Sequence, residues 1–411
     1  MKIIILLLFV SLNILNAQNN FSLNVGEIKE KQYHTSFDFE NIKGKIIIDV
    51  KINNKNRKFI LDTGAPTSIS ASLLSELNYK TVKKSLVSDA NNKVNELEIV
   101  EIPEISINGL SFLNSYALKI SDMSNLECFN IDGIIGSNTL RNSVVNFDFQ
   151  NNKITITDNL KNLGFSKLKA HKLFFIDNQS SPFLQVNLKL GNTDGKIMVL
   201  LDSGDDSFYT LSKNAYNQIM TQVRAKLPQK QMENSDYFKT LDIIASSKGS
   251  FTFSLHGNDD PNIYYKFKVK ELNFGNTRFE NIISTTTYGN ASRIGSEILY
   301  HGQLTLDYKK QKYYFQPYDS ISKININHKI KSFNPTFENN KFIVGIVWDD
   351  ELRDRMKIGD EILKINDVNF ASLSKCEIFR MSMDDFKESN KLIVTLKDFE
   401  TNKIKVIEVA N

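Results

Sequence analysis

The feature that most limits how this chain can fold is a short motif that occurs twice. In both copies an apolar run ends in Asp, a hydroxyl residue and Gly: residues 59–65 read Phe-Ile-Leu-Asp-Thr-Gly-Ala, and residues 198–204 read Met-Val-Leu-Leu-Asp-Ser-Gly. Glycine adopts positive φ values without a steric penalty, so it permits a tight turn directly after a strand. Each copy therefore predicts a carboxylate, that of Asp62 or Asp202, held at the end of a strand.

A pair of such carboxylates suits one particular chemistry. If Asp62 and Asp202 face each other at about 3 Å, both cannot ionise at once, and they share a proton. One carboxylate then activates a water molecule as a general base, while the other acts as a general acid toward a substrate carbonyl. This chemistry needs no metal, no cofactor and no nucleophilic side chain, and it suits hydrolysis of a peptide bond.

The two turns resemble the active-site loops of aspartic proteases, in particular the retropepsin-like domains of exported bacterial proteins. In that family an apolar pair before a glycine follows each turn and braces the loop from below. Residues 134–136 read Ile-Ile-Gly and fit this pattern well. Residues 293–295 read Arg-Ile-Gly, so an arginine replaces one apolar residue. The resemblance implies that Gly136 and Gly295 are the bracing glycines.

A closing strand pair follows each brace, at residues 144–156 and again at residues 303–315. The resemblance covers about residues 40–318, and it implies a mostly β protein with two retropepsin-like β-barrel lobes in a pepsin-like bilobal arrangement. We expect the N-terminal lobe at residues 18–160 and the C-terminal lobe at residues 161–318.

The resemblance also implies roles for single residues. Asp62 and Asp202 would be catalytic, and the hydroxyls of Thr63 and Ser203 would join the two loops through bonds to backbone. Support for the loops would come from Thr63, Gly64, Ser203, Gly204, Gly136 and Gly295. A hairpin over residues 82–100, with a strong turn signal at residues 89–92, would be the flap that excludes water. Its candidate tip residues are Ser88, Asp89 and Ala90, and the alternative is a plain surface hairpin.

After Pro317 the pattern changes. Residues 341–347 are typical of a buried strand, and Gly-Asp at 359–360 followed by Ile-Leu-Lys-Ile-Asn resembles the most recognisable segment of PDZ domains. A helix at 383–388 and closing strands at 391–396 and 403–409 would fit the size and order of a PDZ domain. We therefore expect a PDZ-like domain at residues 319–411, a module that binds extended peptides by adding a strand to a sheet edge. The usual Gly-rich carboxylate-binding loop is not evident before Phe342.

The N-terminal residues are typical of a targeting segment. Residues 1–17 contain Lys2, an apolar run and a small residue at a plausible cleavage point, which predicts a signal peptide. The alternative is an uncleaved membrane anchor, but the run is short for a span of about 20 residues. We expect the mature chain to be exported, to the periplasm or as a secreted protein.

Composition excludes several other classes. The net charge of +4 over 411 residues is too small to indicate nucleic acid or an anionic membrane. The chain has no His-Glu-x-x-His segment and no paired-Cys spacing, so the sequence predicts no metal site. Its two cysteines, Cys128 and Cys376, lie in different predicted domains, and we expect two separate buried thiols rather than a disulfide.

The sequence therefore predicts an exported aspartic endopeptidase with a polypeptide substrate, and with a peptide or protein partner for the PDZ-like domain. Two departures favour an alternative, a catalytically inactive peptide-binding protein of the same fold. Asp205 and Asp206 follow Gly204, where the family usually has Ala, Thr or Ser first, and Arg293 replaces one apolar residue of the second brace. If the second lobe has drifted, Asp62 would need a second chain, so a homodimer is the alternative to the expected monomer.

Overall fold

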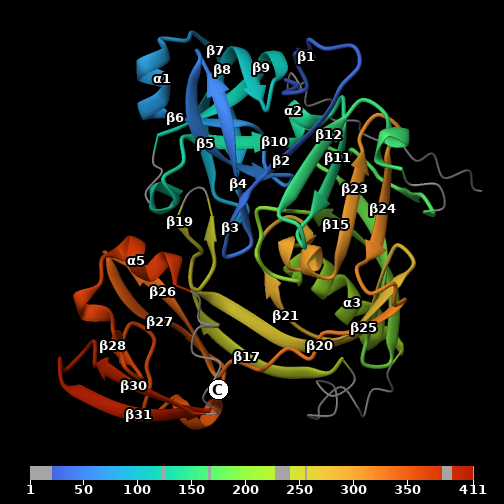
Figure 1. Ribbon diagram of the computed structural model, residues 1–411. Coiled ribbons are helices and arrows are strands. Elements are labelled where there is room, and N and C mark those ends of the chain that lie inside the picture. The colour runs from blue at the N-terminus through green and yellow to red at the C-terminus, as the bar shows by residue number, and fades with distance from the viewer. Residues whose placement is uncertain are drawn as a thin grey trace, which may run out of the picture.

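The computed structural model describes residues 21–121, 126–164, 168–226, 241–254, 257–381 and 391–410. Two expectations, the signal peptide at 1–17 and the helix at 383–388, lie outside these residues. The described chain is mostly β and forms several sheets, which confirms the expected structural class (Figure 1). None of the described helices has the length and apolar character needed to cross a lipid bilayer.

The first half of the molecule, residues 21–163, is built on a nine-stranded sheet. Its strands are β1 (Glu27–Ile28), β3 (Glu40–Ile42), β4 (Lys45–Ile52), β5 (Lys55–Asp62), β6 (Ser68–Ser70), β7 (Thr81–Ser88), β8 (Val94–Ile107), β9 (Leu110–Ile120) and β10 (Gly133–Gly136). The short helices are α1 (Ala71–Leu77), η1 (Leu126–Phe129), α2 (Ser137–Leu140) and η2 (Leu160–Leu163). Strand β5 ends at Asp62, and β10 runs parallel beside it.

The second half, residues 171–325, repeats this plan in an eight-stranded sheet. Its strands are β14 (Phe183–Leu190), β15 (Thr193–Leu201), β16 (Tyr209–Ser212), β17 (Ile243–Gly249), β20 (Asn262–Phe274), β21 (Thr277–Thr287), β22 (Ser292–Ile294) and β25 (Lys323–Asn325). Helices α3 (Lys213–Lys226) and η4 (Ser296–Tyr300) and the hairpin β18 (Phe253–Ser254) and β19 (Gly257–Asn258) complete it. Strand β15 ends one residue before Asp202, with β22 parallel beside it.

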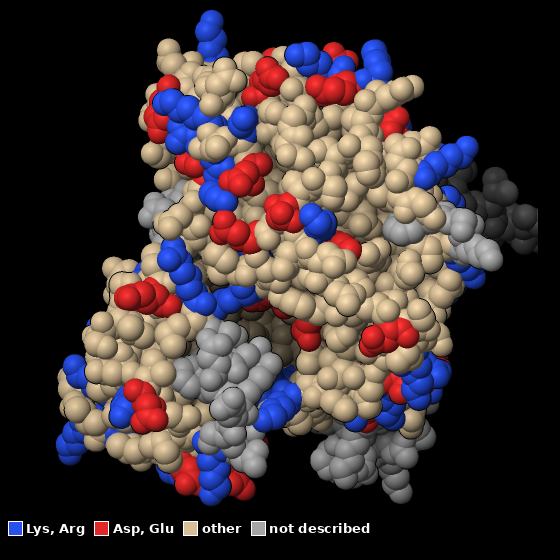
Figure 2. Space-filling view, in the orientation of Figure 1, with Lys and Arg blue, Asp and Glu red and all other residues tan. Residues whose placement is uncertain are grey.

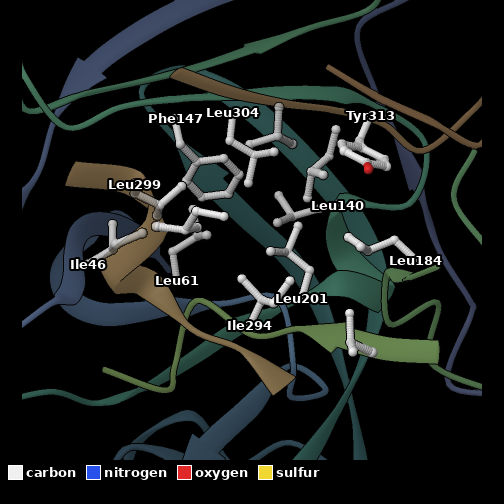
Figure 3. Close-up of a cluster of buried hydrophobic side chains, with 14 of the residues drawn as sticks. Ile46, Leu61, Leu140, Phe147, Leu184, Leu201, Ile294, Leu299, Leu304 and Tyr313 are labelled. Carbon is white, nitrogen blue, oxygen red and sulfur yellow. The ribbon is translucent and has the colours of Figure 1, made fainter. Parts of the chain in front are cut away.

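A six-stranded sheet joins the two halves. It contains β13 (His171–Lys172), β24 (Lys312–Pro317), β23 (Gly302–Asp307), β11 (Val144–Asp148), β12 (Lys153–Thr157) and β2 (His34–Asp38), in that order. Its central pair, β11 and β23, brings one strand from each predicted closing pair side by side. Leu61 and Leu201, which precede the two aspartates, are both buried in the core beneath this sheet, close to Phe147 and Leu304 (Figure 3).

The C-terminal part, residues 333–410, has a sheet and a core of its own. Its elements are β26 (Phe333–Glu338), β27 (Lys341–Val347), η5 (Asp350–Leu352), β28 (Glu361–Ile365), β29 (Val368–Asn369), η6 (Phe370–Ser372), α5 (Lys375–Arg380), β30 (Lys391–Lys397) and β31 (Ile404–Ala410). Asp360 is fully buried and bonds to Lys405 Nζ at 2.7 Å and to the N–H groups of Lys357 and Phe399. The Gly-Asp dipeptide therefore has a structural function in this part.

The prediction that the two cysteines are separate thiols is wrong. Cys128 in η1 and Cys376 in α5 form a disulfide, although they are 248 residues apart in the sequence. The bond exists because the C-terminal part folds back against the first half, so that α5 packs on η1. Figure 2 shows a hollow near the middle of the visible face, between the C-terminal part at the lower left and the rest of the molecule.

Candidate active site

The two Asp-containing turns meet at the interface between the halves. Gly64 lies so close to the carboxyl group of Asp202 that any Cβ at this position would collide with it, and Gly204 lies equally close to the carboxyl group of Asp62. Asp62 Oδ1 accepts the Gly64 N–H at 2.8 Å, and Asp202 Oδ1 accepts the Gly204 N–H at 3.0 Å. The two carboxyl groups are within hydrogen-bonding reach of each other. The structure thus brings both predicted aspartates together in nearly symmetric surroundings.

Thr63 and Ser203 connect the two turns through a reciprocal set of buried hydrogen bonds. Thr63 Oγ1 accepts the Ser203 N–H at 3.0 Å and donates to the Leu201 carbonyl at 2.7 Å. Ser203 Oγ accepts the Thr63 N–H at 2.9 Å and donates to the Leu61 carbonyl at 3.0 Å. Each hydroxyl therefore satisfies one donor and one acceptor of the opposite half, which holds the two carboxylates in register.

The two predicted bracing glycines lie beside the turns, at the ends of the neighbouring parallel strands β10 and β22. Gly136 pairs with Asp62 across the parallel strands β10 and β5, and a Cβ on Gly136 would collide with the Ala65 carbonyl. In the second half, a Cβ on Gly295 would collide with the carbonyls of Ser207 and Asp205. Only glycine therefore lets the two backbone segments approach this closely.

The predicted flap is a hairpin of β7 and β8. Ser88 ends β7, and Asp89 Oδ1 accepts the N–H groups of Asn91 and Lys93 at 2.9 and 2.8 Å, which closes the turn. Ala90 lies within this turn, and its carbonyl accepts a hydrogen bond from the second half.

The tip of this hairpin is fastened to the second half of the molecule. Asn92 Nδ2 donates to the Tyr288 carbonyl at 2.6 Å, Thr252 Oγ1 bonds to Asn91 Oδ1 at 3.1 Å, and Ser254 Oγ donates to Asp89 Oδ2. These bonds join residues that are far apart in sequence, so the hairpin is held down in this structure rather than standing free.

Arg293 contacts both the hairpin and one of the aspartates. Its Nη2 donates to the Ala90 carbonyl at 3.0 Å, and its Nε lies 3.3 Å from Asp202 Oδ2 without forming a hydrogen bond. The side chain is 9% exposed. The corresponding residue of the first half is the apolar Ile134, so the site is asymmetric at this position.

Lys45 is a site residue that the sequence did not predict. It begins β4, and its Nζ donates to the carbonyl of Gly204. Burial lowers the pKa of Lys45, but Asp206, Asp205 and the two central aspartates outweigh this effect, so its pKa is raised. In the sequence, Lys45 is marked only by its position directly before the apolar run at residues 46–48.

The central carboxyl groups hold their protons more tightly than exposed ones. Burial raises the pKa of Asp62, and it raises the pKa of Asp202 to about 7, with the charge of Asp62 as the second cause and Arg293 acting in the opposite direction. Burial also raises the pKa of Asp205, and Asp202 adds to this effect. A pair with raised pKa values can carry one proton and one negative charge near neutral pH.

Comparisons with known proteins agree with this geometry for the first half. Residues 48–139 match a family model described as aspartyl protease, and this match includes Asp62, the hairpin tip at 88–90 and Gly136. A search of curated proteins found no match. Residues 48–139 of this chain therefore form an aspartyl protease domain of the retropepsin-like type.

Proposed function

We propose that this protein is an aspartic endopeptidase whose two catalytic carboxylates, those of Asp62 and Asp202, come from the two halves of one chain. The observation that carries the proposal is the reciprocal bonding of the two turns, in which Thr63 and Ser203 exchange hydrogen bonds across the interface. Family membership of residues 48–139 supports peptidase activity and a polypeptide substrate.

The mechanism follows from the shared proton. The ionised carboxylate takes a proton from a water molecule lying between the aspartates, and that water attacks the scissile carbonyl. The protonated carboxyl group donates to the carbonyl oxygen as negative charge develops there. When the tetrahedral intermediate collapses and the C–N bond breaks, the carboxyl group that took the proton from water gives it to the leaving nitrogen. The other carboxylate takes a proton back from a hydroxyl of the intermediate as the C=O bond re-forms.

The wider architecture belongs to the same proposal. Two lobes, at residues 18–160 and 161–318, would hold an extended peptide between the hairpin tip and the carboxylates, and residues 319–411 would be a PDZ-like domain. The repeated order of strand, turn, brace and closing pair in the two halves supports the first assignment. The separate sheet and core of residues 333–410 support the second. Export rests on residues 1–17 alone.

Arg293 favours a second candidate, a peptide-binding protein that does not cleave. Its side chain contacts the hairpin tip at Ala90 and also Asp202, so it lies in the gap where the peptide would pass. An ion pair on Asp202 favours the ionised form of this carboxyl group, which would leave the shared proton on Asp62. Because Arg293 occupies the space between the hairpin tip and Asp202, an active enzyme must move this side chain when its substrate binds.

Cleavage of a peptide library by the purified chain, across a range of pH and with mass-spectrometric detection, separates the candidates. The proposal predicts cleavage that a statine-type inhibitor blocks and that Asp62→Asn and Asp202→Asn each abolish. Asp194→Asn, an exposed control far from the site, should leave cleavage unchanged. Loss of cleavage with Asp62→Asn alone would favour a dimer of first halves, and inhibitor binding without cleavage would favour the non-cleaving protein.

A further inference from the structure

The apolar surface beside Asp62 lies on the carboxylate side of the first sheet. Successive side chains of a strand point to opposite faces, so Ile60 shares the face of Asp62, two residues later. Ile134 pairs with Ile60 in the neighbouring strand and lies on this face too. Their neighbours Leu61 and Ile135 point the other way, into the main core. Ile60 and Ile134 thus belong to a separate cluster next to the candidate catalytic pair.

This second cluster, here called the carboxylate-side cluster, is covered by a residue from a distant part of the chain. Its buried members are Ile47, Ile60, Ile120, Phe129, Ile131 and Ile134. Three partly buried residues pack against it: Ile42, Ala65, which directly follows the Asp-Thr-Gly turn, and Phe379 of α5. The Phe379 ring meets the Phe129 ring edge-on, with centroids 5.6 Å apart. An aromatic side chain of the C-terminal part therefore packs on the cluster to which Ile60 and Ile134, the apolar neighbours of Asp62, belong.

Helix α5 is fastened in this position from both ends. The disulfide from Cys376 to Cys128 ties it to η1, and Arg380 Nε donates to the Cys128 carbonyl. Lys43 Nζ, from the turn before β4, donates to the Phe379 carbonyl and lies 5.8 Å from the ring centroid. In Figure 1, α5 lies on the side of the C-terminal part that is turned toward the first half.

The same ring also contacts the second half and the C-terminal sheet. Its centroid lies 6.2 Å from that of Phe253 in β18 and 6.1 Å from that of Phe337 in β26. Ser254, the next residue of β18, holds the hairpin tip at Asp89. Strand β18 therefore connects the ring that packs on the carboxylate-side cluster with the bond that holds the hairpin tip.

We propose that Phe379 is an intramolecular competitor of the substrate, and that the C-terminal part holds the enzyme in a self-inhibited state. This inference rests on the proposed function, because the carboxylate-side cluster is where an apolar side chain flanking the scissile bond would bind. An ordinary interdomain contact could use any outer face, whereas this one uses the face that carries the carboxylate of Asp62. Full activity requires the Phe379 ring to leave the cluster, and the disulfide between Cys376 of α5 and Cys128, which directly precedes Phe129, opposes this movement.

The test measures binding of a non-cleavable probe, a fluorescein-labelled statine-type peptide with apolar side chains, to the full chain by fluorescence anisotropy. Phe379→Ala should bind the probe at least about tenfold more tightly than the wild-type protein. The matched control is Phe399→Ala, an exposed phenylalanine of the same part (53% exposed), which should not change the affinity. A double Cys128→Ser, Cys376→Ser variant should also bind more tightly, because α5 is no longer tethered.

Each outcome has a separate meaning. Equal affinity for wild-type and Phe379→Ala, or no binding to either, overturns the inference, as does an equal gain in Phe399→Ala. If Phe379→Ala does not fold, the cysteine variant decides by the same criterion. Peptide cleavage by the same variants is measured in parallel. Tighter probe binding without any cleavage would support Phe379 as a competitor but refute the endopeptidase. Cleavage with unchanged probe binding would support the endopeptidase but refute Phe379 as a competitor.

Discussion

Replacement of Thr63 by valine tests how strongly the two turns hold each other. Valine keeps the shape of the side chain, which is 1% exposed, but it removes the hydroxyl that accepts from Ser203 N and donates to the Leu201 carbonyl. Both backbone groups are then buried without a partner. At about 1–3 kcal/mol for each unsatisfied group, Thr63→Val should lower the free energy of unfolding by about 2–6 kcal/mol.

Thr210 provides the matched control. Its Oγ1 is also buried but has no hydrogen-bond partner, so Thr210→Val removes a hydroxyl without breaking a bond. This variant should be as stable as the wild-type protein or slightly more stable. Urea unfolding of the full chain, followed by circular dichroism, measures both changes. A loss in Thr63→Val no larger than that in Thr210→Val would refute the structural role assigned to the reciprocal bonds.

Two further predictions concern charge. Arg293 lowers the pKa of Asp202, so Arg293→Gln should raise this pKa above about 7. The alkaline limb of the kcat/KM profile should then move to higher pH. No shift, or a shift to lower pH, would contradict the contact between Arg293 and Asp202. The folded-state pKa of Asp202, about 7, lies above its ordinary value of 3.8, so the folded state binds this proton more tightly than the unfolded state. The contribution of Asp202 to the unfolding free energy therefore falls as pH rises from about 4 to about 7. Urea unfolding at several pH values across that range measures this contribution. The free energy of unfolding should fall less with rising pH in Asp202→Asn than in the wild-type protein, and an equal fall in both would contradict the assignment.

Local patterns in the sequence were sufficient to locate the turns and the hairpin. The turn after β5 is closed locally, by bonds from the Gly64 and Ala65 N–H groups to Asp62 Oδ1, and the tip at Asp89 is closed by bonds within four residues of the chain. The mostly β class is confirmed, and residues 48–139 match the aspartyl protease family. The domain boundaries and the PDZ-like assignment stay predictions.

The rest of the site depends on contacts that no local pattern contains. Lys45 reaches Gly204 only because the two halves pack together, and Arg293 reaches the hairpin tip for the same reason. The disulfide was missed because Cys128 and Cys376 lie in parts of the chain that the sequence assigned to separate domains. Long-range docking decides such contacts, and a single sequence carries little information about it.

Titration of the carboxyl carbons of Asp62 and Asp202 shows whether these two residues share one proton. NMR of the aspartate-selectively ¹³C-labelled chain, with the Asp202 signal assigned by its absence in Asp202→Asn, gives the pKa of Asp202. We expect a pKa of about 7 for Asp202 in the wild-type protein and a lower pKa in Asp62→Asn, because the neighbouring charge is gone. A pKa of Asp202 near 3.8 in the wild-type protein, or one that does not change in Asp62→Asn, would contradict it.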